Sequence, residues 1–190
     1  MKNQLEIIVQ KHRDAVERSF TGTQMETLAQ IAREFARCLK AGGKILFCGN
    51  GGSAADSQHI AAEFVGRFLI NRPALAAIAL TTDTSILTAV ANDFGYDQVF
   101  SRQVEALGAA GDVLVAISTS GMSKSILLAC DEAKKKKMVT IGFTGVRGGD
   151  LAKQADIVFA AQHEETAHVQ EIHMVSLHAI SEAVEKVFFG

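Results

Sequence analysis

The chain alternates between stretches of helical periodicity and short runs that are apolar at nearly every position. Apolar side chains recur at helical spacing over residues 5–20 and again over residues 23–39, before Gly42 and Gly43 interrupt the pattern. A third periodic segment covers residues 164–189. We therefore predict two helices ahead of residue 40 and one long helix at the carboxyl end.

Five short apolar runs lie between these helices, at residues 44–48, 75–80, 113–117, 139–143 and 157–160. Runs without alternation fit strands that are covered on both faces, as in a parallel sheet between helices. The pattern predicts an α/β fold, a three-layer, doubly wound domain with helical ends. Because the one proline, Pro73, stands in no Pro- or Ser-rich linker, we expect residues 1–190 to form a single domain with an N-terminal helical segment of about residues 1–40.

Composition narrows the classes of partner. A formal net charge of −2 provides no broad cationic field for nucleic acid, although a local pocket for one phosphate is compatible with it. The three cysteines form neither a C-x-x-C pair nor a disulfide framework, which favours a reducing compartment. No apolar run approaches the roughly 18 residues of a membrane span. We expect a cytoplasmic protein without nucleic-acid or membrane partners.

Two strand-to-helix loops repeat one local design. Residues 49–53 read Gly-Asn-Gly-Gly-Ser after the first predicted strand, and residues 118–123 read Ser-Thr-Ser-Gly-Met-Ser after the third. Glycines let the backbone approach a ligand, while hydroxyls and free amides at a helix start bind an anion such as phosphate. Each loop alone also fits an ordinary turn or helix cap. As a pair at the carboxyl ends of parallel strands, they predict one phosphate-binding crevice.

Helical spacing brings further polar residues near this crevice. His59 and Glu63 are four apart on the helix that follows the first loop, which suits two ligands of one metal, an acid and base pair, or a simple surface contact. Gln170 and His178 lie eight apart on the last helix, about 12 Å along its axis. Either a metal lies between two extended side chains, or one of them comes from a neighbouring subunit.

The remaining polar candidates have plainer interpretations. We expect Asp83 to cap a helix and the lysines of residues 134–137 to form a solvated face. His173 is expected to be a buried or interface histidine. Surface or packing roles are the expectation for three further histidines without partner spacing: His12, His163 and His168.

Four segments in order give the chain a family resemblance. They are Gly-Asn-Gly-Gly-Ser-Ala-Ala-Asp-Ser-Gln-His-Ile-Ala-Ala-Glu at 49–63, Ala-Asn-Asp-Phe-Gly-Tyr at 91–96, Ile-Ser-Thr-Ser-Gly-Met-Ser at 117–123 and Val-Gln-Glu-Ile-His-Met at 169–174. Together they resemble the phosphoheptose isomerases of the sugar isomerase (SIS) domain superfamily, and the match covers nearly the whole chain. The resemblance implies a five-stranded parallel sheet, a homotetramer with active sites at subunit contacts, and conversion of sedoheptulose 7-phosphate to D-glycero-D-manno-heptose 7-phosphate, the first step toward heptose precursors of surface glycans.

The resemblance also implies roles for individual residues. Positions matching His59, Glu63, Gln170 and His178 hold one Zn²⁺ per subunit. Glu63 and Gln170 are also counted among the residues that meet the sugar phosphate, with Asn50, Gly51, Gly52, Ser53, Asn92, Asp93, Ser118, Thr119, Ser120 and Ser123. Two departures from the family pattern are Met122 in the second loop and Ala167-His168-Val169 ahead of Gln170.

Residue chemistry assigns the steps. Moving a carbonyl between neighbouring carbons removes one carbon-bound proton and returns another through an enediolate whose charge needs stabilisation. We assign Glu63 as the base and His178 as the acid, and Asp56 as an orienting or relaying residue. One alternative is a non-catalytic SIS-domain tetramer that binds the bacterial replication initiator; another is an isomerase for a different sugar phosphate, such as a pentose phosphate. Retention of both Glu63 and His178 favours catalysis over the first.

Overall fold

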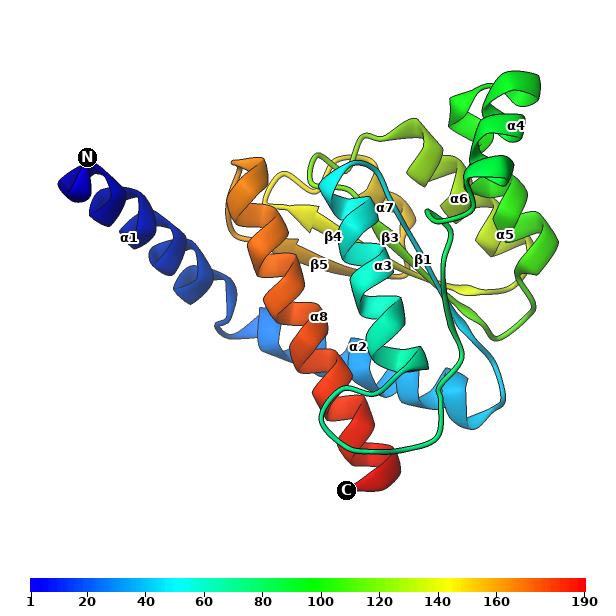
Figure 1. Ribbon diagram of the computed structural model, residues 1–190, viewed down its shortest axis with the longest axis horizontal. Coiled ribbons are helices and arrows are strands. Elements are labelled where there is room, and N and C mark those ends of the chain that lie inside the picture. Colours follow the sequence, from blue (N-terminus) through cyan, green and yellow to red (C-terminus); the bar gives the residue numbers. More distant parts are fainter.

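A central sheet of five parallel strands organises the chain. A computed structural model, which describes residues 1–190, orders the strands β2-β1-β3-β4-β5 (Figure 1). The strands are β1 (Ile45–Gly49), β2 (Ala77–Ala79), β3 (Val113–Ile117), β4 (Val139–Gly145) and β5 (Ile157–Ala161). All five predicted strands and their parallel pairing are therefore confirmed, although β2 is shorter than the apolar run that predicted it.

Helices follow the predicted pattern at both ends of the chain. The helices are α1 (Lys2–Ser19), α2 (Thr23–Lys40), α3 (Gly52–Val65), α4 (Thr84–Phe94), α5 (Ser101–Leu107), α6 (Lys124–Lys135), α7 (Leu151–Gln154) and α8 (Thr166–Phe189), with a 3-10 turn η1 (Tyr96–Gln98). The two predicted N-terminal helices are α1 and α2, and the predicted long C-terminal helix is α8. None of the helices combines the length and apolar character that crossing a membrane requires.

The sheet is covered on both faces, which explains its continuous apolar strands. Ile45 and Phe47 of β1 pack into one core with α2, α3 and α8, whereas Leu46 and Cys48 pack into a second core with α5, α6 and α7. Successive side chains of a strand point to opposite faces, so one apolar run supplies both layers. The three-layer arrangement expected from the sequence is confirmed.

The strand order places a crevice at a defined position. β1 is followed by β2 on one side and by β3 on the other, so the winding direction reverses between β1 and β3. In doubly wound sheets, ligands bind outside the carboxyl ends of the strands at such a switch point. The two loops of the sequence prediction leave the sheet at this point.

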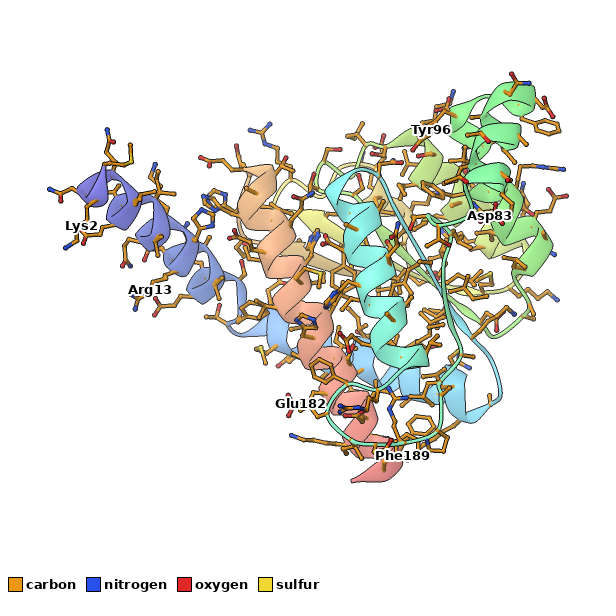
Figure 2. All side chains as sticks on the ribbon, in the orientation of Figure 1. Lys2, Arg13, Asp83, Tyr96, Glu182 and Phe189 are labelled. Atoms are coloured by element: carbon orange, nitrogen blue, oxygen red, sulfur yellow. The ribbon has the colours of Figure 1, made fainter.

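Helix α1 extends away from the other layers (Figure 1). It buries only Ala15 and Ser19, and the Lys2 and Arg13 side chains project outward from it (Figure 2). Its C-terminal end is attached through Ser19, whose hydroxyl oxygen accepts a hydrogen bond from the Gln162 backbone N–H at 2.8 Å. The rest of α1 is therefore anchored mainly by its packing against α8.

Candidate active site

One pocket collects both predicted phosphate loops. A cavity of about 320 Å³ lies at the carboxyl ends of β1 and β3. Its polar lining consists of Asn50, Gly51, Gly52, Ser53, Ser118, Thr119, Ser120, Ser123, Thr166 and Gln170. The expectation that the two loops face one crevice is thus confirmed as geometry.

The first loop is shaped for a close backbone approach. Gly51 adopts a φ of +56° and precedes α3 without supplying a side-chain cap. The Ser53 and Ala54 amides donate to the Asn50 and Gly51 carbonyls, whereas the Gly51 and Gly52 amides have no acceptor in the chain and are open to an anion. Asn50 is held from both sides, since its Nδ2 donates to Ser125 Oγ at 3.0 Å and its Oδ1 accepts from Tyr96 Oη at 2.8 Å. These bonds orient the loop relative to α6 and η1.

The second loop is closed by its own hydroxyls and by a neighbouring turn. Ser118 Oγ donates to Ser123 Oγ at 3.2 Å, and the Ser120 hydroxyl accepts from the Met122 backbone N–H at 3.2 Å. Gly121 has a φ of +66°, and an added Cβ would collide with the backbone oxygen of Gly148. A glycine is therefore required at this contact, whereas Met122 is exposed.

Asn92 and Asp93 lie at the end of α4, outside this pocket within one chain. Both are exposed, and the Asn92 amide donates to the Asp93 carboxylate at 2.8 Å. Their link to the site is Tyr96, three residues beyond Asp93, which donates to Asn50. Their expected contact with substrate stays a prediction.

A second group of side chains forms a potential metal centre. His59 and Glu63 of α3 meet His178 of α8, with ligand atoms from all three residues within 4.8 Å of one another. His59 Nε2 lies 2.9 Å from His178 Nε2 and 3.4 Å from Glu63 Oε1. The side chains of His59 and Glu63 are 50% and 23% exposed, so the group is open to solvent and substrate.

This geometry fits a shared cation. An imidazole nitrogen offers one in-plane direction, either an N–H or a lone pair, so His59 Nε2 cannot serve both neighbours by hydrogen bonding. Two nitrogen ligands of a tetrahedral zinc ion, each at 2.0–2.1 Å, lie about 3.3 Å apart, close to the spacings of this group. Two imidazoles and a carboxylate are also a donor set that zinc accepts.

Gln170 lies with the phosphate loops. It lines their pocket, and its side chain packs so closely against Gly52 that an added Cβ there would collide with it. Its side chain forms no hydrogen bond with His59, Glu63 or His178. Within one chain, three of the four predicted metal ligands therefore converge, while metal binding itself and the role of Gln170 stay predictions.

Comparisons with known proteins agree with this geometry. The SIS domain family model matches residues 10–145. A phosphoheptose isomerase of Roseiflexus sp. is 51% identical over 174 residues, covering 92% of this chain and 88% of the relative, and one of Desulfovibrio desulfuricans is 50% identical over 187 residues, covering 97% and 89%. The solved phosphoheptose isomerase of Neisseria gonorrhoeae has a TM-score of 0.90 at 43% identity, covering 96% of this chain and 98% of the other.

The chain belongs to the SIS domain family, among the phosphoheptose isomerases. It is therefore an isomerase. This result favours the enzyme over the non-catalytic alternative considered from the sequence.

A buried ion pair, which no local sequence pattern indicates, supports the potential metal centre. The Glu185 carboxylate on α8 accepts N–H bonds from Phe68, Leu69 and Ile70 at 2.7–3.1 Å and pairs with Arg72 at 2.8 Å. Burial raises the pKa of Glu185, but these donors together hold it below its usual value. The Arg72 guanidinium also donates to the Glu63 backbone carbonyl at 2.7 Å. The ion pair thus connects the helices that carry Glu63 and His178.

Two neighbours shape the surroundings of the potential metal centre. Phe68 stacks on the His178 imidazole with ring centroids 5.6 Å apart. Asp56 lies one turn before His59, and burial raises its pKa to about 6 while the charge of His59 acts in the opposite direction. Its Oδ2 is buried without a hydrogen-bond partner. The relay or orienting role of Asp56 stays a prediction.

Other sequence expectations have clear outcomes. Asp83 caps α4 by accepting the Ile86 N–H at 2.9 Å, and His173 is fully buried with Nε2 against the Thr144 carbonyl at 2.9 Å. Both expectations are confirmed. The surface or packing roles expected for His12 and His168 agree with their burial, since His168 is buried and His12 is partly exposed, and the two imidazoles also meet. Their contact joins α1 to α8 across 156 residues of sequence, so it could not be predicted from the spacing of neighbouring residues.

Proposed function

We propose that this protein converts sedoheptulose 7-phosphate to D-glycero-D-manno-heptose 7-phosphate, as an early step in making activated heptose. The convergence of Glu63 and His178, on two helices that also line the two-loop phosphate pocket, is the observation that carries the proposal. The names of the relatives support the substrate class.

The phosphate group of the substrate binds between the two loops. Gly51 and Gly52 allow backbone amides to approach it, while Ser53, Ser118 and the hydroxyls of residues 119–123 donate hydrogen bonds without adding charge. Gln170, against Gly52, is positioned to meet the sugar next to the phosphate. Asn92 and Asp93 bind sugar hydroxyls in this proposal. Fixing the phosphate holds the reacting carbons at a constant distance from it.

The reaction itself is a proton exchange between C1 and C2. The Glu63 carboxylate takes the C1 proton of the ketose, which leaves an enediolate, and returns a proton to C2 to give the aldose. The His178 imidazole, oriented by Phe68, moves the proton between the two oxygens. His59, Glu63 and His178 would hold a divalent cation, which would polarise the carbonyl and stabilise the enediolate.

The finer assignments belong to the same proposal. The cation is Zn²⁺, one per subunit at this centre, and Gln170 completes its ligands from its own or a neighbouring subunit. The 190 residues act as one SIS-type domain in a cytoplasmic homotetramer, and the product enters lipopolysaccharide or other surface-glycan synthesis. The family resemblance supports these assignments, and the half-exposed His59 leaves room for a further ligand at the site.

Turnover of defined substrates tests the proposal. The purified protein is incubated with sedoheptulose 7-phosphate, and aldose formation is followed by NMR. We expect Glu63→Gln to lower turnover by about 10²–10⁴-fold, because the base is lost together with one potential ligand of the cation, while inorganic phosphate still binds in the two loops. Glu182→Gln, an exposed change on α8, is the matched control. Full activity of Glu63→Gln would show that Glu63 is not the base. Turnover of a pentose phosphate but not of sedoheptulose 7-phosphate would show that the proposed substrate is wrong.

A further inference from the structure

A second histidine and glutamate group lies where α1 meets α8. It consists of His12 on α1 with His168 and Glu171 on α8, and we refer to these three residues as the His12 cluster. His168 precedes His178 by ten residues, about 15 Å along the helix axis. The His12 cluster is therefore separate from the centre formed by His59, Glu63 and His178.

The ligand atoms of the His12 cluster converge as closely as those of the first centre. All lie within 4.8 Å of one another. His12 Nδ1 is 3.0 Å from His168 Nδ1 and in direct contact with Glu171 Oε2, while His168 Nδ1 is 4.0 Å from the same carboxylate oxygen. The spacing brackets the roughly 3.3 Å expected between two ligand atoms of a tetrahedral zinc ion.

Hydrogen bonding alone does not satisfy this arrangement. His12 Nδ1 faces both the Glu171 carboxylate and His168 Nδ1, yet it has a single in-plane direction. If His12 Nδ1 carries a proton for the carboxylate, it offers His168 no lone pair; if it is unprotonated, the carboxylate receives no proton from it. One cation among the three atoms resolves both contacts.

A second observation points to the same ligand. His168 Nε2, the nitrogen directed away from the cluster, lies 3.4 Å from the carboxylate of Glu165. Metal-bound histidines usually donate their other N–H to a carboxylate or carbonyl, which orients the ring and increases its basicity. His168 therefore has the convergence expected of a ligand, and its other nitrogen has a carboxylate within ion-pair range, although without a hydrogen bond.

We propose that the His12 cluster binds a divalent cation of the zinc class, which fastens α1 to α8. Two imidazoles and one carboxylate favour Zn²⁺ over Mg²⁺ or Ca²⁺. The His168 side chain is 5% exposed, whereas those of His12 and Glu171 are 29% and 48% exposed. The site is therefore open to solvent on one side, where an ion can enter and bind a further ligand such as water. Because α1 buries only two residues, a metal bond at its third turn adds a substantial anchor.

Metal stoichiometry tests the proposal. The full chain is stripped with a chelator, loaded with Zn²⁺, separated from free metal, and assayed for zinc per chain. We expect two zinc ions for the wild type, one for His12→Gln, one for His59→Gln, and none for the double variant. Glu182→Gln, whose exposed side chain lies farther along α8 (Figure 2), should retain two. His12 and Glu171 are partly exposed, so substitutions there leave the core intact.

The outcomes separate the two centres. Loss of all zinc in His59→Gln, or two zinc ions in His12→Gln, would overturn the proposal. Loss of all zinc in His12→Gln, with zinc retained in His59→Gln, would support the His12 cluster as a metal site. The same result would contradict zinc binding by His59, Glu63 and His178. As a second measurement, Zn²⁺ at 100 times its Kd should raise the Tm of His59→Gln by about 5–10 °C, and no such rise should occur once His12→Gln is added. An unchanged Tm in His59→Gln would also contradict the anchor.

Discussion

Burial of His173 makes the stability of the protein depend on pH. This imidazole is fully buried beside Phe143 and Phe159, and its Nε2–H donates to the Thr144 carbonyl while Nδ1 has no partner. Burial lowers the pKa of His173 from 6.5 to about 4, although the Thr144 carbonyl favours the charged form. The folded protein therefore keeps His173 neutral at pH values where the unfolded chain protonates it.

The pKa shift of His173 gives the direction and the size of the change in the free energy of unfolding with pH. Between pH 6.5 and about 4 the unfolded chain binds more protons than the folded protein, so the free energy of unfolding falls as the pH falls. A shift of about 2.5 pKa units corresponds to about 3 kcal/mol over the window, at 1.36 kcal/mol per unit. This is a large part of the 5–15 kcal/mol typical of folded proteins.

Urea unfolding of the wild type and His173→Gln measures the effect. Both proteins are stripped of metal and compared at equal subunit concentration, at pH 7.5 and at pH 4.5, by far-UV circular dichroism. Glutamine retains a donor for the Thr144 carbonyl but does not titrate. We expect the stability advantage of the wild type over the variant to shrink by about 2–3 kcal/mol at the lower pH. An advantage that is equal at both pH values would refute the reasoning, since all shared titrations cancel in the difference.

Two further substitutions test the phosphate loops and the buried ion pair. Gly121→Ala should lower stability by about 1–3 kcal/mol and weaken phosphate binding, because φ is positive there and the new Cβ meets the backbone of Gly148. Gly42→Ala, with positive φ but open space, is the control, and equal phosphate affinity in both variants would argue against the close approach. Glu185→Ala should cost about 3–5 kcal/mol in urea unfolding, because a buried guanidinium loses its partner. Glu182→Ala should cost less than about 0.5 kcal/mol, and a similar loss from both glutamates would contradict the ion pair's importance.

Local sequence was sufficient for the elements and for part of the site. The five apolar runs predicted the strands because a strand covered on both faces needs apolar side chains at every position. Helical spacing put His59 and Glu63 on one face of α3, since four residues make about one turn. The capping role of Asp83 and the burial of His173 were likewise predictable from neighbouring residues.

The decisive contacts of the site join residues that are far apart in the sequence, so local patterns do not predict them. His178 joins His59 across 119 residues, and Glu185 reaches the loop after α3 across 113–117 residues. The spacing of Gln170 and His178 left two arrangements open, and packing places Gln170 against Gly52 in the phosphate pocket.

Residue types and short-range periodicity thus determined the strands, the helices, the two glycine and serine loops and the pairing of His59 with Glu63. Only the tertiary structure decided the strand order, the meeting of α3 with α8 and the contact of His12 with His168. The physical reason is that backbone geometry fixes the relation of residues a few positions apart, whereas contacts between distant segments follow from how whole helices pack on the sheet.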